Sequence, residues 1–417
     1  MGRLYRRLFG RFWNPYLAVL GAGVLSACYF AVTAAQWAVT GEFTRFGGHL
    51  LGVVGVDVSG WDYFQLIGWE GTPLDRTGGW VVVGMLAGAL VAALLGNDFK
   101  FRVPRKRRLF QGLLGGAIAG FGARLALGCN LAAFFTGIPQ FSFHAWLFMV
   151  ALAVGTVAGV KVIRLRFWRG PPKLSAVERL APLSASAANV PSSGLVASRS
   201  AQPFVGVGVA LVVAGVAVFL AYAGEWLLSA AALFGVGFGV LIQRGQICFT
   251  SAFRDLWVSG RATMSKALAV GLLVATVLTF VVIQSGTPAI IEPSSPGTVV
   301  GGLLFGFGIV LAGGCETGMM YRAMEGQVHF VAVFVGNVVG ATVLAYGWDH
   351  WGIYSALTEG WPEVDLVAAW GAGGALLATV TLVAGWLVFS RWWERRYRYG
   401  TGLGSGRQRR PVSESVS

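Results

Sequence analysis

The sequence predicts an all-α membrane protein, a polytopic bundle of about ten helices that cross a lipid bilayer. Its 417 residues are 55% hydrophobic and only 12% charged, and their mean hydropathy is +0.67. So few charged residues could not cover the surface of a water-soluble protein of this length. The 61 glycines point the same way, because small residues let helices pack closely inside a membrane. We therefore expect the bilayer to be the solvent of most of the chain.

Apolar segments long enough to cross a hydrocarbon core of roughly 30 Å occur about ten times. They cover residues 15–39, 78–96, 109–128, 143–163, 203–223, 227–243, 265–285, 298–314, 328–347 and 366–390. Several of them end in glycine-rich or polar stretches at a depth where a full span would continue. This predicts broken or re-entrant helices that line a cavity, since irregular backbone persists inside a membrane only where protein or water satisfies it.

The net charge of +14 is concentrated in short segments between the apolar runs. Of the 32 Lys and Arg residues, 28 fall in the segments 1–12, 98–108, 161–202, 244–266 and 391–410. Under the positive-inside rule these are cytoplasmic loops and tails, so we expect a multi-pass protein of the cell inner membrane with both termini in the cytoplasm. Because the charge forms no continuous basic face, the sequence argues against a nucleic-acid partner.

An internal repeat indicates duplication. Residues 115–130, GGAIAGFGARLALGCN, match residues 301–316, GGLLFGFGIVLAGGCE, without a gap and with nine identities in 16 positions. Counting spans from a cytoplasmic N-terminus gives the two copies opposite orientations. Inverted repeats of this kind are common in secondary transporters, whose substrate sites lie near the midplane.

A weaker echo precedes each copy. QWAVTGEFTR at 36–45 aligns with QICFTSAFR at 246–254, which places Ala38 opposite Cys248. The predicted organisation is a first repeat at 1–163, a cytoplasmic linker at 164–202, a bridging span at 203–226, a second, inverted repeat at 227–347, and a last span with a basic cytoplasmic tail at 348–417.

The four cysteines, Cys28, Cys129, Cys248 and Cys315, lack the close spacing of a structural metal site. Free thiols are expected, with no metal and no cofactor. Cys28 lies in an apolar span without polar neighbours and is expected only to pack. The other three adjoin polar residues at points where a helix should break, which favours a functional role for them.

The candidate solute-binding residues combine these thiols with neighbouring polar and basic groups. They are Cys129, Asn130, Cys248, Cys315, Glu316, Thr317, Arg45, Arg124 and Arg254. Arg124 lies within a span, where a charge is costly, so it either attracts an anion or pairs with an acid. Arg45 and Arg254 correspond in the weaker echo and are placed to flank opposite mouths of one pore. The scattered histidines form no catalytic motif, so no enzymatic activity is predicted.

The cysteine segments resemble the YeeE/YedE family of membrane proteins, which includes thiosulfate transporters. The likeness is strongest to its YedE branch, which is associated with selenium metabolism. It extends from Phe12 to about Trp393 and is carried by WAVTGEFTRFGG, GFGARLALGCNLAAFFTGIPQFSFHAW, FGVGFGVLIQRGQICFTSAFRD and GGLLFGFGIVLAGGCETG. The resemblance implies that three cysteines line a central path, and these would be Cys129, Cys248 and Cys315.

We therefore expect a membrane transporter that imports a small sulfur- or selenium-containing solute, such as a thiosulfate-like anion or a selenium species. Its expected partners are that anion and the lipid bilayer. The alternative is a membrane thiol enzyme or transfer scaffold, with Cys248 or Cys315 as nucleophile, that passes a persulfide or selenide to a cytoplasmic sulfur-carrier protein. Covalent carriage would add mass to one cysteine, whereas permeation would not.

Overall fold

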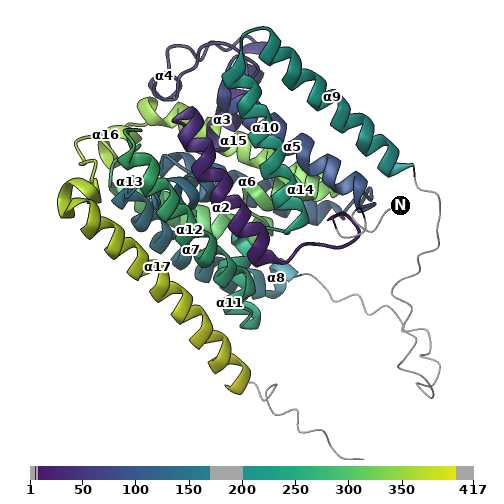
Figure 1. Ribbon diagram of the computed structural model, residues 1–417. Coiled ribbons are helices and arrows are strands. Elements are labelled where there is room, and N and C mark those ends of the chain that lie inside the picture. The colour runs from purple at the N-terminus through teal and green to yellow at the C-terminus, as the bar shows by residue number, and fades with distance from the viewer. Residues whose placement is uncertain (1–4, 6–7, 170–200, 401–417) are drawn as a thin grey trace, which may run out of the picture.

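The protein folds entirely into helices (Figure 1), as predicted. The computed structural model describes residues 5, 8–169 and 201–400, and this part of the chain forms no named strand. The elements are α2 Pro15–Thr33, α3 Thr40–Val53, α4 Asp62–Leu66, α5 Thr77–Leu95, α6 Lys106–Leu125, η1 Ala132–Gly137, α7 Phe143–Arg164, α8 Arg166–Arg169, α9 Gln202–Tyr222, α10 Trp226–Arg244, α11 Phe249–Ser259, α12 Thr263–Gln284, α13 Pro296–Ala312, α14 Glu316–Met324, α15 Val328–His350, α16 Ile353–Leu357 and α17 Leu366–Gly400.

Nine segments of the described chain are long and apolar enough to cross a membrane, one fewer than the ten predicted. The predicted span at 109–128 corresponds to α6, which carries three basic residues in its first turn and Arg124 in its last. With these charges at both of its ends, α6 is not among the nine apolar segments. It nevertheless packs along α15 and α13 in the middle of the bundle, so its surroundings are those of a spanning helix.

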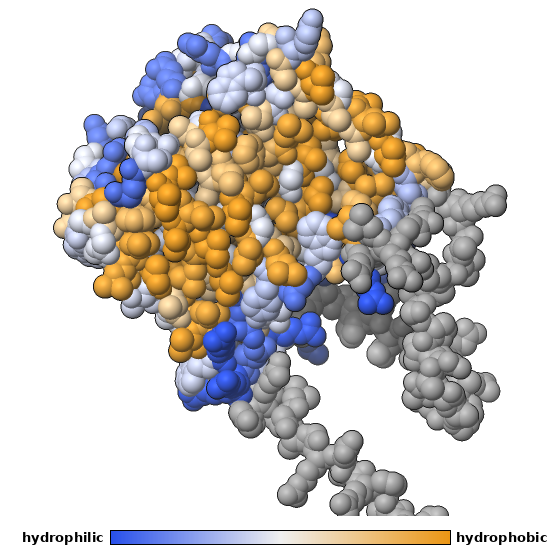
Figure 2. All heavy atoms as spheres, viewed as in Figure 1, coloured by the Kyte–Doolittle hydropathy of each residue, from blue (hydrophilic) through white to orange (hydrophobic). Residues whose placement is uncertain are grey.

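The surface has the distribution of polarity that a bilayer requires. Figure 2 shows hydrophilic side chains near α4 and α16 at one end and near the C-terminal part of α17 at the other, with a hydrophobic band between them. The helices α9 and α17 are the least buried of the long apolar segments, at 11% and 17% of their most apolar windows. Apolar faces of this extent are unfavourable in water, and a bilayer solvates them.

Two pairs of helices pack through glycines at equivalent places in the repeated segments. A Cβ on Gly120 of α6 would lie 2.1 Å from the carbonyl oxygen of Asn337 on α15. A Cβ on Gly306 of α13 would lie 2.2 Å from the carbonyl oxygen of Leu152 on α7. Only glycine allows the two backbones of each pair to approach so closely.

The repeated helices α6 and α13 also contact each other, and they run antiparallel. The Cβ position of Gly115, near the middle of α6, lies 2.3 Å from the backbone nitrogen of Ala312 at the end of α13. The Cβ position of Gly301, near the start of α13, lies 2.6 Å from the backbone nitrogen of Ala126 just after α6. Each contact therefore has a counterpart with the two segments exchanged.

Four long helices break and continue as shorter ones. The predicted breaks around Cys129 and Cys315 are present, between α6 and η1 and between α13 and α14. Two further breaks separate α2 from α3 and α10 from α11. The first two share a left-handed residue at the same place of the repeat, Leu127 with φ 54° and Gly313 with φ 82°. Glycine adopts this conformation freely, whereas leucine is strained in it.

Two of the predicted segments, the linker and the C-terminal tail, are described only in part. The linker expected at 164–202 lies mostly outside the described residues, as does the tail after residue 400. The bridging span expected at 203–226 corresponds to α9. The last span is longer than the 366–390 expected, since α17 extends to Gly400, with one non-helical residue at Gly371.

Candidate functional site

Three of the four cysteines lie at the N-terminal ends of short helices in the middle of the bundle. Cys248 and Cys315 are the N-cap residues of α11 and α14. The carbonyl oxygen of Cys129 accepts a hydrogen bond from the N–H of Ala133 at 2.8 Å, as an N-cap residue does. All three are at most 1% exposed, whereas Cys28 on α2 is exposed at the surface, away from them.

Two of these thiols are in contact. The sulfur atoms of Cys248 and Cys315 lie 3.9 Å apart. The Cys315 sulfur also accepts a hydrogen bond from the N–H of Phe249 at 3.3 Å and lies 3.0 Å from the hydroxyl of Thr317. The breaks in α10 and α13 thus bring together two cysteines that are 67 residues apart in the chain.

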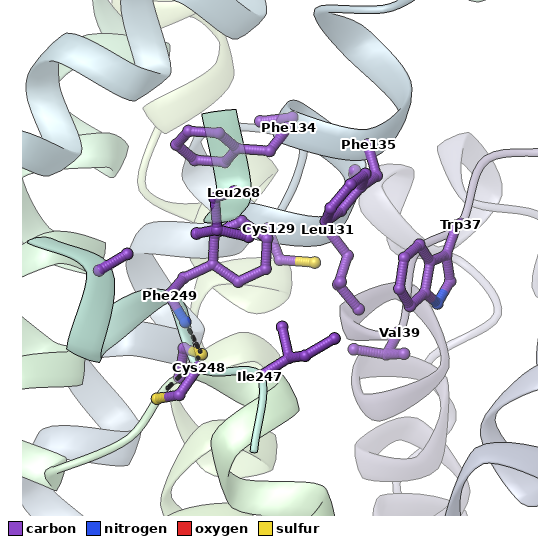
Figure 3. Close-up of a cluster of buried hydrophobic side chains, with 14 of the residues drawn as sticks. Trp37, Val39, Cys129, Leu131, Phe134, Phe135, Ile247, Cys248, Phe249 and Leu268 are labelled. Atoms are coloured by element: carbon purple, nitrogen blue, oxygen red, sulfur yellow. Dashed lines mark hydrogen bonds between the residues drawn. The ribbon is translucent and has the colours of Figure 1, made fainter. Parts of the chain in front are cut away.

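Cys129 belongs to the same buried cluster but touches a different break. Figure 3 shows Cys129 and Cys248 among the apolar side chains of Leu131, Ile247 and Phe249. The Cys129 thiol is in contact with the backbone of Val39, just before α3. In the second repeat, the Cys315 sulfur contacts the N–H of Phe249 in the same way. Val39 follows Ala38 and Phe249 follows Cys248, so the two contacts agree with the weak alignment of Ala38 with Cys248.

Buried polar atoms without protein partners surround the thiols. Glu316, the first residue of α14, is 1% exposed and accepts a hydrogen bond from the Asn337 amide at 3.1 Å, but its second carboxyl oxygen has no partner in the described chain. Asn130, at the equivalent place of the first repeat, is fully buried with both amide atoms unpartnered, and the Thr250 hydroxyl is unpartnered too. Such groups are rare in folded proteins and are available to a solute or water.

A large cavity of about 1020 Å³ approaches these residues from the end of the bundle that carries α4 and α16. Its lining includes Gly128 and Ala132, on either side of Cys129 in the chain, and Ala38, next to the Val39 backbone that the Cys129 thiol contacts. At its rim, hydrogen bonds from the N–H and hydroxyl of Thr72 lower the pKa of Asp75, so this carboxyl stays charged. We call this space the larger cavity.

Two arginines that line the larger cavity differ in whether a carboxylate pairs with them. Arg124 is 6% exposed, lies 5.2 Å from the Tyr63 ring and donates to the Thr40 hydroxyl at 3.2 Å. The alternative of an ion pair for Arg124 finds no support, because no carboxylate lies within salt-bridge distance of it among the described residues. Arg45, in contrast, pairs with Glu42, which also contacts Arg76 at 3.2 Å.

A second cavity, of about 560 Å³, opens at the other end of the bundle. Its lining includes Arg108, Arg164 and Arg254, and it reaches Gly313 and Phe330 beside the break before α14. We call it the smaller cavity. Arg45 and Arg254 thus line different cavities, at opposite ends of the molecule.

The sequence pattern missed one residue of this region, Arg322. Its guanidinium donates to the carbonyl oxygen of Gly313 at 3.1 Å and lies over the rings of Tyr321 and Phe330 at 5.2 and 5.1 Å. A Cβ on Gly318 would lie 2.8 Å from the Cys248 sulfur and 3.6 Å from the Arg322 guanidinium, so cation and thiol border the same small space. The sequence does place Arg322 two helical turns after Cys315 on a short polar helix, and this spacing could have identified it as a candidate site residue.

Two other charged residues near the cysteines already have protein partners. Glu325 accepts hydrogen bonds from three glutamine side chains, Gln243, Gln246 and Gln327, at 3.1, 2.9 and 3.2 Å. Arg254 pairs with the neighbouring Asp255 at 2.8 Å.

The buried His144 and the partly buried His329 have structural partners at the helix breaks. The Nε2 atom of His144 lies 2.6 Å from the Ala126 carbonyl, and that of His329 lies 2.7 Å from the Ala312 carbonyl. The two pairs occupy equivalent places, at the C-terminal ends of α6 and α13. In the described part of the chain, no group of three His, Cys, Asp or Glu residues is arranged to hold a metal.

Comparison with known proteins agrees with this architecture. The family model described as "Sulphur transport" matches residues 2–158 and 244–411. The chain is 48% identical to the probable transporter YedE of Salmonella typhimurium over 97% of both chains, and 48% identical to YedE of Escherichia coli over 93% of this chain and 94% of that one. A shorter region, 26% of this chain and 32% of the relative, is 41% identical to the thiosulfate transporter TsuA of Escherichia coli. No solved structure matches the chain. These matches show that the chain belongs to the sulphur transport family, the YeeE/YedE family of membrane transporters.

Proposed function

We propose that this transporter imports a small sulfur- or selenium-containing anion along a path through the buried cysteines. The observation that carries the proposal is that two cavities, at opposite ends of the bundle, approach one buried layer that holds Cys129, Cys248 and Cys315. The anion would enter the larger cavity, pass Cys129 and then the Cys248 and Cys315 thiols, and leave through the smaller cavity.

The chemistry of each stage suits an anion. Arg124, which has no acid partner in the described part of the chain, supplies positive potential in the larger cavity, and Arg322 does so beside the thiol pair. A thiol is a weak donor and a weak acceptor, so it contacts a terminal sulfur or selenium without the strong hold of a full charge. Successive weak sites favour passage over retention. Asn130, Thr250 and Thr317 provide polar atoms for the oxygens of such an anion.

The orientation in the membrane is part of this proposal. The antiparallel contacts of α6 with α13 support an inverted repeat, and the basic residues around the smaller cavity support its placement on the cytoplasmic side of the cell inner membrane. Both termini would then be cytoplasmic, and the larger cavity would open outward.

Cysteine-accessibility labelling tests the orientation. In a background without native cysteines, a cysteine at Asp62 is expected to react with an impermeant maleimide from outside intact cells, and one at Lys106 only after permeabilisation. Asp62 begins α4, near the larger cavity, and Lys106 begins α6, near the smaller one. Labelling of both positions from the same side would contradict the inverted arrangement.

The solute class rests on the relatives and on the thiols. TsuA, which shares the shorter region, is a thiosulfate transporter by name. Uptake of labelled thiosulfate, selenite and sulfate into cells that lack their own uptake systems tests the proposal. We expect uptake of thiosulfate or selenite above the empty-vector control, because the outer sulfur of thiosulfate and the pyramidal selenium of selenite are open to contact with a thiol. Little uptake of sulfate is expected, because four oxygens enclose its sulfur. Uptake of none of the three by a well-expressed protein would refute the proposal.

The contact between Cys248 and Cys315 also favours the second candidate, a thiol transfer reaction. A thiolate that attacks the terminal sulfur of thiosulfate would form a cysteine persulfide and release sulfite. A cytoplasmic sulfur-carrier protein would then take the persulfide sulfur. The intact mass of protein recovered during turnover separates the two: one added sulfur on a cysteine indicates transfer, and an unchanged mass indicates passage of the intact anion.

A further inference from the structure

Glu316 is a carboxyl group on the proposed path, and no cation among the described residues pairs with it. It follows Cys315 directly and is close enough to the Cys129 and Cys248 thiols to interact with both electrostatically. Its one side-chain hydrogen bond comes from the neutral amide of Asn337, on α15. Within the described chain it forms no salt bridge.

Among the other glutamates, three that are buried or line the larger cavity have surroundings different from those of Glu316. Glu42 is paired with Arg45 and Arg76, and Glu325 is held by three amide groups. Glu292 lines the larger cavity, away from the thiols, and accepts a hydrogen bond from the Gln36 amide at 3.1 Å. Glu316 is therefore the carboxyl that a solute moving between the cysteines would meet at close range.

An anion and a carboxylate cannot share a buried site at full charge. In a poorly hydrated interior their repulsion is screened far less than in water, and one of the two must be neutralised. The groups that face Glu316 from the other elements are the Cys129 and Cys248 thiols and the Asn337 amide, none of which is a cation. Arg322 borders Cys248, on the side of the smaller cavity.

We propose that Glu316 is the proton-binding residue of this transporter and that its proton enters the cell together with the anion. A proton from the outer solution binds the carboxylate, and the resulting carboxylic acid donates its O–H to the anion through the oxygen that has no protein partner. When the anion leaves through the smaller cavity, the proton follows it, and the carboxylate is restored. One proton therefore enters per cycle through Glu316, and this coupling rests on the proposed transport function.

The repeat supplies a reason to expect a neutral variant to fold. Asn130 occupies the place of Glu316 in the first repeat and carries an uncharged amide in a fully buried site. Glu316→Gln keeps the size of the side chain and lets its carbonyl oxygen accept the Asn337 hydrogen bond. The matched control is Glu325→Gln, at the residue that follows the C-terminal end of α14, which removes a buried carboxyl that the path does not use.

The experiment uses the full-length protein in liposomes that contain a pH-sensitive dye, with the membrane potential clamped at zero. An inward gradient of thiosulfate, or of selenite if cells take up only that anion, is expected to acidify the lumen with wild-type protein and with Glu325→Gln. Glu316→Gln should carry the anion down its gradient without acidification. At zero potential, a tenfold inward proton gradient should drive up to tenfold anion accumulation by wild-type protein, and none by Glu316→Gln.

Two results would overturn the coupling. One is anion uptake by wild-type protein without any proton influx, and the other is proton influx that persists in Glu316→Gln. If Glu316→Gln is folded but inactive, the variant Glu316→Asp decides between two roles. Proton influx regained with the shorter acid supports the proposal. Equal inactivity of both variants rejects it and indicates that the size and shape of the Glu316 side chain are what transport requires. Absence of anion uptake by wild-type protein in cells and liposomes would refute the transport function itself.

Discussion

Replacement of Cys248 or Cys315 by serine is expected to lower anion uptake by about fivefold to a hundredfold, whereas Cys28→Ser should leave it near the wild-type rate. The two buried sulfurs lie 3.9 Å apart, and Cys28 is exposed on α2. A hydroxyl forms stronger hydrogen bonds than a thiol, and one additional bond of about 0.5–1.5 kcal/mol in the resting protein or to the solute slows passage severalfold to tenfold. Two such contacts multiply the effect.

Initial uptake rates at matched membrane expression measure this prediction, and thermal unfolding in detergent shows whether the variants fold. The uptake rate of Cys129→Ser is expected to fall as well, because Gly128 and Ala132, on either side of Cys129 in the chain, line the larger cavity. Wild-type rates in all three serine variants would refute the cysteine path. A comparable loss in Cys28→Ser would indicate damage to the protein in general and not to the path.

The sequence predicted the helix breaks well because their signals are local. Gly128, Cys129 and Asn130 interrupt an apolar run, and the match with 301–316 repeats the interruption, so each break could be placed to within a few residues. The contact of Cys248 with Cys315 could not be predicted in the same way. It depends on how two separate breaks meet in the bundle, and neither segment carries that information alone.

Charges were harder to assign than breaks, because the state of an arginine depends on its partners. Arg124 and Arg45 looked alike as basic residues away from the cytoplasmic segments. The structure gives Arg45 a carboxylate partner from its own helix and leaves Arg124 with a hydroxyl and a ring. Composition alone does not identify α6 as a span, because four basic residues lie on it, yet it packs in the centre of the bundle as predicted for a span.

Arg322 illustrates what only the fold reveals. Its sequence neighbours, a methionine-rich stretch and a tyrosine, do not suggest an anion site. In the structure the guanidinium is held by a backbone carbonyl and two aromatic rings, without a salt bridge in the described chain. Aromatic faces and carbonyls orient a cation without cancelling its charge. Arg322 therefore keeps its positive potential beside the Cys248 thiol.

Arg322→Gln is accordingly expected to reduce anion uptake by about tenfold to a hundredfold, the equivalent of one lost charge-assisted hydrogen bond of about 1.5–3 kcal/mol. Arg322→Lys should recover part of the rate, because it restores the charge but not the planar guanidinium that stacks on Tyr321 and Phe330. The control is Arg254→Gln, which removes a cation from the same smaller cavity that Asp255 already balances, and its rate should fall by less than threefold. Initial uptake rates of the three variants, compared at equal expression and with unfolding temperatures measured in detergent, give the answer. If Arg322→Gln transports as fast as Arg254→Gln, the charge of Arg322 does not act on the solute.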